Sequence, residues 1–295
     1  MNTEKDIRDD EIRVIGEEEG KSHSDKKRRW IKIVISLVSI GLIVVLFAML
    51  LSERAQQRED VTTYFDPQPE IGIQDHQRPK RLGRDVDSLV RGFIEIQDTI
   101  INDIPLRIYI PHNAKMSLHV GRLNKRDSDI IFAAQAADIR RDNKKIVGAF
   151  VLKGEPLAWG LSKTGYCAII NDKITIGIAD NSPLFEEATE KNGYFFRQYP
   201  LVDNGKLVEN EPKNKAVRRA LCDRNGEILM VESGTGESFH DFAQALVDLG
   251  MTNAIYLVGS SAFGWAVDDY GNRIEFGIEN PRLPKNASYI VWRRR

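Results

Sequence analysis

The sequence carries almost no excess of either charge. It has 42 Lys and Arg against 43 Asp and Glu, a formal net charge of −1 at pH 7. Proteins that follow a nucleic-acid backbone usually carry a marked basic excess. The sequence also lacks a Gly-Lys-Ser/Thr phosphate loop and a complete dinucleotide glycine fingerprint. Both absences argue against nucleic-acid and nucleotide binding.

Histidine is equally scarce. The five histidines stand at positions 23, 76, 112, 119 and 240 and show no metal-ligand spacing. We therefore predict no metal site built on histidine and no cofactor, and the sequence leaves the use of a divalent cation open.

One long apolar segment stands out. Residues 31–51 are apolar apart from Lys32, Ser36 and Ser39. A helix of this length spans about 30 Å, the thickness of the hydrocarbon core of a bilayer. Four basic residues, Lys26 to Arg29, precede the segment directly, and clustered Lys and Arg stay cytoplasmic. We predict an uncleaved single-pass anchor in the inner (cell) membrane, with a cytoplasmic N-terminus and a periplasmic or extracellular C-terminal domain.

The rest of the chain divides around this segment. Residues 1–29 are highly charged and are expected to form a cytoplasmic tail. Residues 52–85 contain Pro67, Pro69 and Pro79 and indicate an extended linker. Residues 86–295 are expected to form the extracytoplasmic domain. Its two cysteines, Cys167 and Cys222, are either a disulfide, which an oxidising compartment permits, or, as the default, two buried small apolar residues.

The pattern within 86–295 predicts an α+β fold, mainly sheet with two short packed helices. Alternation and β-branched runs predict strands near 93–96, 106–110, 130–134, 147–152, 166–170 and 173–178, with a turn at Asn171-Asp172. Ser182-Pro183 predicts the start of one helix, and Ser238 caps a second over 239–249 that Gly250 ends.

Two glycine-containing segments are candidate binding elements. The segment 233–236 follows a strand and precedes the second helix, which suggests a loop with free backbone N–H groups. Gly259-Ser260-Ser261 ends the predicted strand 254–258, where small residues let a ligand approach the backbone. Each also has a purely structural interpretation as an ordinary turn. A hairpin turning near Gly271-Asn272 is predicted to follow.

The order of these motifs resembles the phosphodiester glycosidase family. Val217-Arg-Arg-Ala-Leu221 is similar to its Arg-Thr-Ala segment, a strand ending at Glu232-Ser-Gly to its Asp-Gly strand, and Asn253-Ala-Ile-Tyr-Leu-Val-Gly-Ser-Ser261 to its Asn-Ala-Ile-Asn-Leu-Asp-Gly-Gly-Gly-Ser segment. Gln135-Ala-Ala-Asp-Ile139 is a fainter match to its Asn-(Ala/Gly)-Gly-Phe-Phe. Two departures stand out: Val258 replaces an aspartate, and the aromatic pair is missing.

The resemblance implies a hydrolase of sugar phosphodiester linkages in envelope or dietary glycans. Arg218 is expected to bind the phosphate and Glu232 to act as acid or base, while Gln135, Gly259, Ser260 and Ser261 bind the substrate. The three segments are expected to converge on one cleft that faces 233–236. Alternatively, the domain is a non-catalytic glycan-binding or cell-envelope accessory module on the same fold, with Arg218 in a surface ion pair and Glu232 only complementing a helix dipole.

Overall fold

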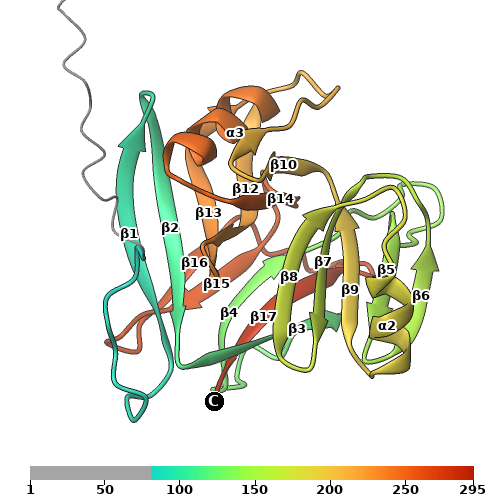
Figure 1. Cartoon of the computed structure of the whole chain (residues 1–295). Coiled ribbons are helices and arrows are strands. Elements are labelled where there is room, and N and C mark those ends of the chain that lie inside the picture. The colour runs from blue at the N-terminus through green and yellow to red at the C-terminus, as the bar shows by residue number, and fades with distance from the viewer. Residues whose placement is uncertain (1–80) are drawn as a thin grey trace, which may run out of the picture. The chain divides into compact units, whose positions relative to one another are not determined.

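The computed structural model describes residues 81–295, which belong to one compact unit. The predicted cytoplasmic tail, the anchor at 31–51 and most of the predicted linker lie outside the described residues. Among residues 81–295, no helix is both long enough and apolar enough to cross a bilayer. The described part is mainly sheet with two helices, consistent with the predicted α+β class (Figure 1).

A seven-stranded sheet forms the centre of the fold. Its spatial order is β1 (Phe93–Ile101), β2 (Ile104–His112), β13 (Glu227–Glu237), β12 (Ala216–Arg224), β14 (Asn253–Leu257), β10 (Pro200–Asp203) and β11 (Lys206–Leu207). Strands from both ends of the domain therefore lie side by side, because β2 pairs with β13. Local turns connect the hairpins: Asn102 and Asp103 both have positive φ, the backbone of a tight two-residue turn.

Two five-stranded sheets complete the fold. One has the order β16 (Arg273–Phe276), β15 (Gly264–Val267), β4 (Ile130–Gln135), β17 (Ser288–Arg294) and β3 (Ala114–Val120). The other has the order β6 (Glu155–Trp159), β5 (Ala149–Leu152), β9 (Tyr194–Gln198), β7 (Gly165–Ile170) and β8 (Lys173–Ile178). The predicted turn at Asn171-Asp172 joins β7 to β8 with φ of 50° and 64°, and the predicted hairpin joins β15 to β16.

Both predicted helices are present. Helix α3 (Phe239–Asp248) begins after Ser238, whose hydroxyl accepts a hydrogen bond from Asp241 N at 3.0 Å, and Gly250 with φ of 90° follows it. Its buried apolar stripe packs on one face of the seven-stranded sheet. Helix α2 (Leu184–Glu190) begins one residue after Pro183, and the Ser182 hydroxyl accepts from Leu184 N.

The two faces of the seven-stranded sheet are buried in different cores. The α3 face forms one cluster with residues such as Ala220, Cys222 and Val231. The opposite face contributes Leu221, Met230 and Leu257 to a larger cluster shared with the β4–β15–β17 sheet. Neighbouring residues on β12 therefore point into different cores, since side chains alternate along a strand.

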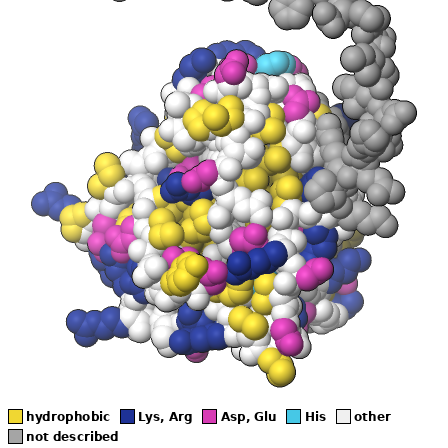
Figure 2. Space-filling view, turned by 90° about the vertical axis from the view of Figure 1, so that its left-hand side faces the viewer, with side chains coloured by type: hydrophobic (Ala, Val, Ile, Leu, Met, Phe, Trp, Pro, Cys, Tyr) yellow, Lys and Arg dark blue, Asp and Glu magenta, His cyan; other side chains and the backbone are white. Residues whose placement is uncertain are grey.

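The surface repeats the charge balance of the sequence. Figure 2 shows the face on the β1 side, where hydrophobic, basic and acidic side chains intermix and no single sign dominates the described part. Just before the β1–β2 hairpin, Leu82 N and Gly83 N donate to the Glu227 carboxylate at 2.7 and 3.0 Å. The chain thus joins the domain already at the end of the segment predicted as linker.

Candidate functional site

The Gly259-Ser260-Ser261 loop is tied to strand β12 by its backbone. Ser260 N donates to Val217 O at 2.8 Å, and Gly259 N donates to the Tyr256 hydroxyl at 3.1 Å. A Cβ on Gly259 would lie 2.2 Å from Val217 O, so only glycine permits this approach. Ser260 has φ of 53°, a left-handed conformation that costs a non-glycine residue energy. These contacts fix the conformation of Gly259-Ser260-Ser261, and this segment is called the corner below.

The Arg219 side chain holds the same loop by hydrogen bonds to its backbone carbonyls. Its guanidinium donates to Ala262 O at 2.6 Å, to Val258 O at 3.3 Å and to Ser260 O at 3.5 Å. It also bonds the Glu232 carboxylate, and its side chain is only 2% exposed. A charged group this deeply buried needs such partners, because unpaired burial of a charge is costly. Arg219 therefore positions the corner that the sequence singled out.

Arg218 does not join this arrangement, which corrects the predicted convergence. Its side chain lies on the α3 face, where it donates to Glu237 O at 2.8 Å and bonds Asn214 O. Its guanidinium carbon lies 4.1 Å from the centre of the Phe239 ring. Because adjacent residues alternate across a strand, the arginine that meets Glu232 and the loop is the neighbour, Arg219.

Glu232 faces a hollow other than the one beside the loop. That hollow, of about 550 Å³, is lined by residues of β1, β2 and β13, including Arg107 and Gly234. Glu232 stands in a row of alternating charges, since Asp98 pairs with Arg107, Arg107 lies opposite Glu232, and Glu232 lies opposite Arg219. One carboxylate oxygen is already bound by Arg219. Glu232 is thus linked to the corner through Arg219 and does not line the cleft beside it.

The predicted glycine-rich loop at 233–236 is also different in the structure. These residues continue β13, which extends to Glu237 and pairs there with Ala216 and Val217 of β12. Gly234 lies against Pro105. Strand pairing holds the two ends of the segment, Ser233 opposite Leu106 and Gly236 opposite Val217, so it is extended strand rather than the expected anion-binding loop, and it does not line the cleft beside Ser260.

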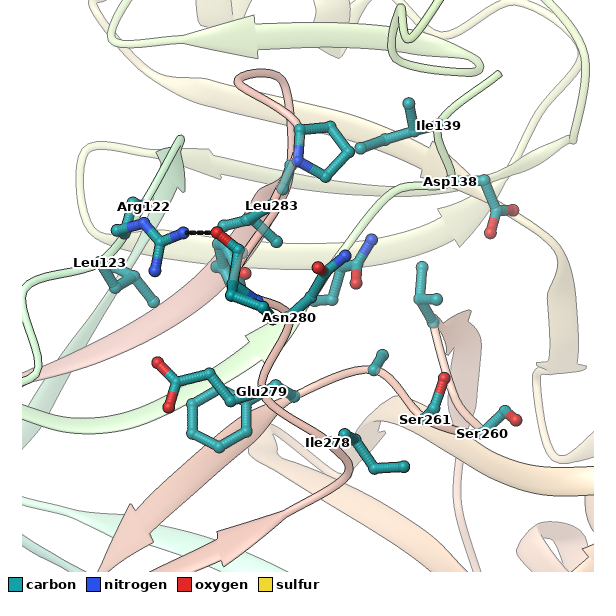
Figure 3. Close-up of a pocket in the computed structure, with 18 of the residues that line it drawn as sticks. Arg122, Leu123, Asp138, Ile139, Ser260, Ser261, Ile278, Glu279, Asn280 and Leu283 are labelled. Atoms are coloured by element: carbon teal, nitrogen blue, oxygen red, sulfur yellow. Dashed lines mark hydrogen bonds between the residues drawn. The ribbon is translucent and has the colours of Figure 1, made fainter. Parts of the chain in front are cut away.

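A cleft of about 690 Å³ opens beside the corner (Figure 3). It brings together four of the predicted site residues, Gln135, Gly259, Ser260 and Ser261. Val258 also lines it and donates its backbone N–H to Gln135 O at 3.1 Å. Five basic residues and two acidic ones share its walls: Arg122, Lys125, Arg140, Arg141, Lys144, Asp138 and Glu279. The cleft is therefore concave, with walls that are apolar over much of their area and carry more basic than acidic side chains, which suits an anionic ligand.

A polar cluster at one wall was not among the predicted site residues. Lys163 Nζ bonds the Asp138 carboxylate and donates to Gln198 Oε1 at 2.7 Å, while Gln198 Nε2 donates to Asp138 Oδ2 at 3.2 Å. Burial lowers the pKa of the Lys163 ammonium. The Asp138 carboxylate acts in the opposite direction but only partly offsets this lowering. Asp138 belongs to the segment Gln135–Ile139 noted in the sequence, but no pattern pointed to Lys163.

Other candidate chemistries find no support in the described residues. Residues 81–295 contain no cluster of three His, Cys, Asp or Glu side chains that would hold a metal ion. Cys167 and Cys222 are free and buried in different cores. Burial raises the pKa of both thiols, so both behave as small apolar residues.

Comparison with known proteins gives the family. Among curated proteins no significant match is found. The zebrafish N-acetylglucosamine-1-phosphodiester alpha-N-acetylglucosaminidase catalytic domain, auto-inhibited by its pro-peptide, has a TM-score of 0.50 at 14% identity and covers 73% of this chain and 86% of its own. A hypothetical protein from Synechocystis has a TM-score of 0.50 at 16% identity, covering 68% and 62%. These structures share the fold. The phosphodiester glycosidase family model matches residues 128–290, and the chain belongs to that family.

Proposed function

We propose that this protein is a membrane-anchored hydrolase of sugar phosphodiester linkages in envelope or dietary glycans. The observation that carries the proposal is the placement of the Gly259-Ser260-Ser261 corner in the wall of a basic cleft. Family membership supplies the reaction class, cleavage between a sugar and a phosphate. The cleft supplies basic side chains that match the charge of the phosphate.

The chemistry of the cleft suits a sugar phosphodiester. Basic side chains such as Arg122 and Arg141 attract the phosphate, and guanidinium groups bind two of its oxygens at once, whereas Arg140 is already paired with Asp142. The Ser260 and Ser261 hydroxyls and the Gln135 amide offer donors and acceptors to sugar hydroxyls. Arg219 binds the backbone of the corner, and Glu232 in turn binds Arg219. Binding and orientation of the substrate are thus divided between the two walls.

The proposed location follows from the sequence. A single-pass anchor at 31–51, preceded by basic residues, puts the domain in the periplasm or outside the cell, where envelope glycans lie. Protease treatment of spheroplasts tests this: it should digest residues 81–295 and leave the N-terminal tail protected. Protection of the whole chain until the membrane is dissolved would contradict the proposed topology.

The activity is tested with the full-length chain in detergent. We expect it to release free N-acetylglucosamine from UDP-N-acetylglucosamine, or free glucose from a glucose-1-phosphate methyl diester. The double variant Arg122→Gln/Arg141→Gln should raise KM about 5- to 30-fold, since each exposed ion contact contributes about 0.5–1 kcal/mol. The matched control Arg91→Gln/Arg126→Gln removes two exposed arginines that do not line the cleft and should leave KM unchanged. Lack of sugar release from either substrate would overturn the hydrolase.

One observation favours a second candidate, a non-catalytic glycan-binding module. Val258 lines the cleft at the position where the family pattern has an aspartate, so one carboxylate is missing. Under this alternative the same sugar phosphodiesters bind without turnover. Calorimetric titration of the full-length chain with the methyl diester separates the two: binding without sugar release would favour the module.

A further inference from the structure

The carboxylate missing at position 258 has a counterpart on the neighbouring segment. Val258 N donates to Gln135 O at 3.1 Å, so the end of β14 lies against the end of β4. Asp138 follows three residues after Gln135 and lines the same cleft as Val258, Ser260 and Ser261. Figure 3 shows its carboxylate pointing into the cleft on the side of Ser260 and Ser261. A carboxylate is therefore present in the cleft, though at a different place in the sequence.

The two oxygens of Asp138 have different surroundings. Lys163 Nζ and Gln198 Nε2 both bind Oδ2, the latter at 3.2 Å. No hydrogen bond among residues 81–295 reaches Oδ1. The Asp138 side chain is 35% exposed, whereas that of Lys163 is only 6% exposed. The buried side of the carboxylate is thus fixed, and its open side faces the cleft.

A purely structural ion pair explains this arrangement poorly. Burying an ammonium costs free energy, and an apolar pair of similar volume usually stabilises a fold as well or better. Lys163 also has φ of 75°, an unfavourable conformation for a side chain with a Cβ. The fold thus accepts a buried and strained Lys163, and this lysine binds an Asp138 carboxylate that remains open to the cleft on one side. Such an arrangement is typical of functional sites.

We propose that Asp138 is the catalytic carboxylate of this chain and that Lys163 and Gln198 position it. The proposal rests on the proposed hydrolase function. Asp138 Oδ1 accepts a proton from a water molecule while the water oxygen forms a bond to C1 of the sugar. The bond from C1 to the phosphate oxygen breaks, and its electron pair leaves with the phosphate. The products are the free sugar and a phosphate monoester.

The nature of the leaving group explains why one carboxylate suffices. Ordinary glycosidases use two, because an alkoxide leaving group must be protonated by an acid. A phosphate monoester is stable as an anion, with a second pKa of about 6, and departs without that proton. The basic side chains of the cleft further stabilise its charge. No second carboxylate is then required beside Asp138.

The test measures kcat and KM of full-length variants on the substrate that the wild type hydrolyses. Asp138→Asn keeps the shape of the side chain and should lower kcat about 10²–10⁴-fold with KM nearly unchanged. Asp138→Ala should regain part of this activity in sodium formate, because a small carboxylate fills the vacated space. Asp172→Asn, an exposed carboxylate paired with Lys115, is the matched control and should retain full activity.

Lys163 is tested through the rate–pH profile. Its pKa is lowered by burial, so the wild-type rate should fall at alkaline pH below 10.5, as the ammonium that orients Asp138 loses its proton. Lys163→Met should lose about tenfold in kcat and abolish this alkaline limb, because the side chain that holds Asp138 no longer carries a titrating ammonium. A profile unchanged in Lys163→Met would assign the pair to structure alone.

The outcomes separate this inference from the proposed function. If the wild type releases sugar and Asp138→Asn does so equally well, Asp138 is not catalytic although the hydrolase stands. Loss of activity in Glu279→Gln but not in Asp138→Asn would assign the role to the other carboxylate of the cleft. If the wild type releases no sugar from either substrate, the proposed function itself fails. Circular dichroism melting of each variant confirms that the comparison is between folded proteins.

Discussion

The two faces of the seven-stranded sheet treat neighbouring arginines very differently. On the α3 face, Arg218 lies over the Phe239 ring and donates to the backbone oxygens of Asn214 and Glu237. On the other face, Arg219 binds Glu232 and the carbonyls of the loop that lines the cleft. Both residues are almost fully buried. Burial alone therefore does not tell which arginine serves the site.

The difference lies in what each guanidinium holds. Arg218 joins the ends of β12 and β13 to the start of α3, a contact that stabilises the sheet and helix. Arg219 joins β12 to the corner at 258–262, whose backbone would otherwise have carbonyl groups without donors. One face thus maintains the fold, and the other fixes the shape of the cleft. Substitutions on the two faces should separate these effects.

The largest effect is expected at Arg219. Arg219→Met leaves the Glu232 carboxylate without its cation and removes the donors to the loop. We expect a loss of about 3–5 kcal/mol in the free energy of unfolding, the usual cost of breaking a buried ion pair, together with loss of sugar release. Urea unfolding followed by tryptophan fluorescence measures it. The double variant Arg219→Met/Glu232→Gln should recover part of the stability, because no unpaired charge stays buried. Equal stability of the single variant and the wild type would contradict this role.

Gly259→Ala should disturb the same face by a backbone clash. The added Cβ would lie 2.2 Å from Val217 O, a backbone atom that cannot move away by rotation. We expect a loss of about 1–3 kcal/mol, typical of overpacking, and a rise in KM as the corner moves. Gly236→Ala is the matched control, since its nearest neighbour lies at 3.8 Å, and it should change stability little. Two variants of equal stability would show that the corner is looser than its contacts indicate.

Arg218→Met should separate the two faces most directly. It removes two hydrogen bonds and the contact with the Phe239 ring, and we expect a loss of about 1–2 kcal/mol. The kcat and KM per folded molecule should stay within about twofold of the wild type, because the loop contacts on the other face are untouched. A fall in kcat as large as that of Arg219→Met would restore the original hypothesis that Arg218 serves the site.

The sequence predicted the elements whose signals are local. Helix α3 has a cap, an apolar stripe and a terminal glycine within 13 residues of one another, and β8 has the predicted bounds. All four predicted substrate-binding residues do line one cleft, because they lie at the ends of neighbouring segments. The strand at 233–236 was missed, since glycines favour loops and only pairing with β12 keeps this segment extended.

The faces of the sheet were harder to predict. Strand β12 is buried on both sides, so its residues carry no alternation of polar and apolar types that would assign Arg218 or Arg219 to a face. A register shift between Val217 and Arg219 adds to the ambiguity. Lys163 reaches Asp138 from 25 positions away along the chain, a tertiary contact without any local signal. Sequence thus located the cleft, while long-range pairing decided which charged groups serve it.

The smallest effect is expected at Ser260, on the side of the corner that faces solvent. Its backbone is held by Val217 O and Arg219, while its φ of 53° favours glycine. Ser260→Gly relieves this strain but gains flexibility in the unfolded chain, so stability should change by less than about 1 kcal/mol. The lost hydroxyl should still raise KM about threefold to tenfold if it binds a sugar hydroxyl, since such a hydrogen bond contributes about 0.5–1.5 kcal/mol. An unchanged KM would assign Ser260 to the turn alone, and the cleft would then bind its ligand through the remaining side chains of its walls.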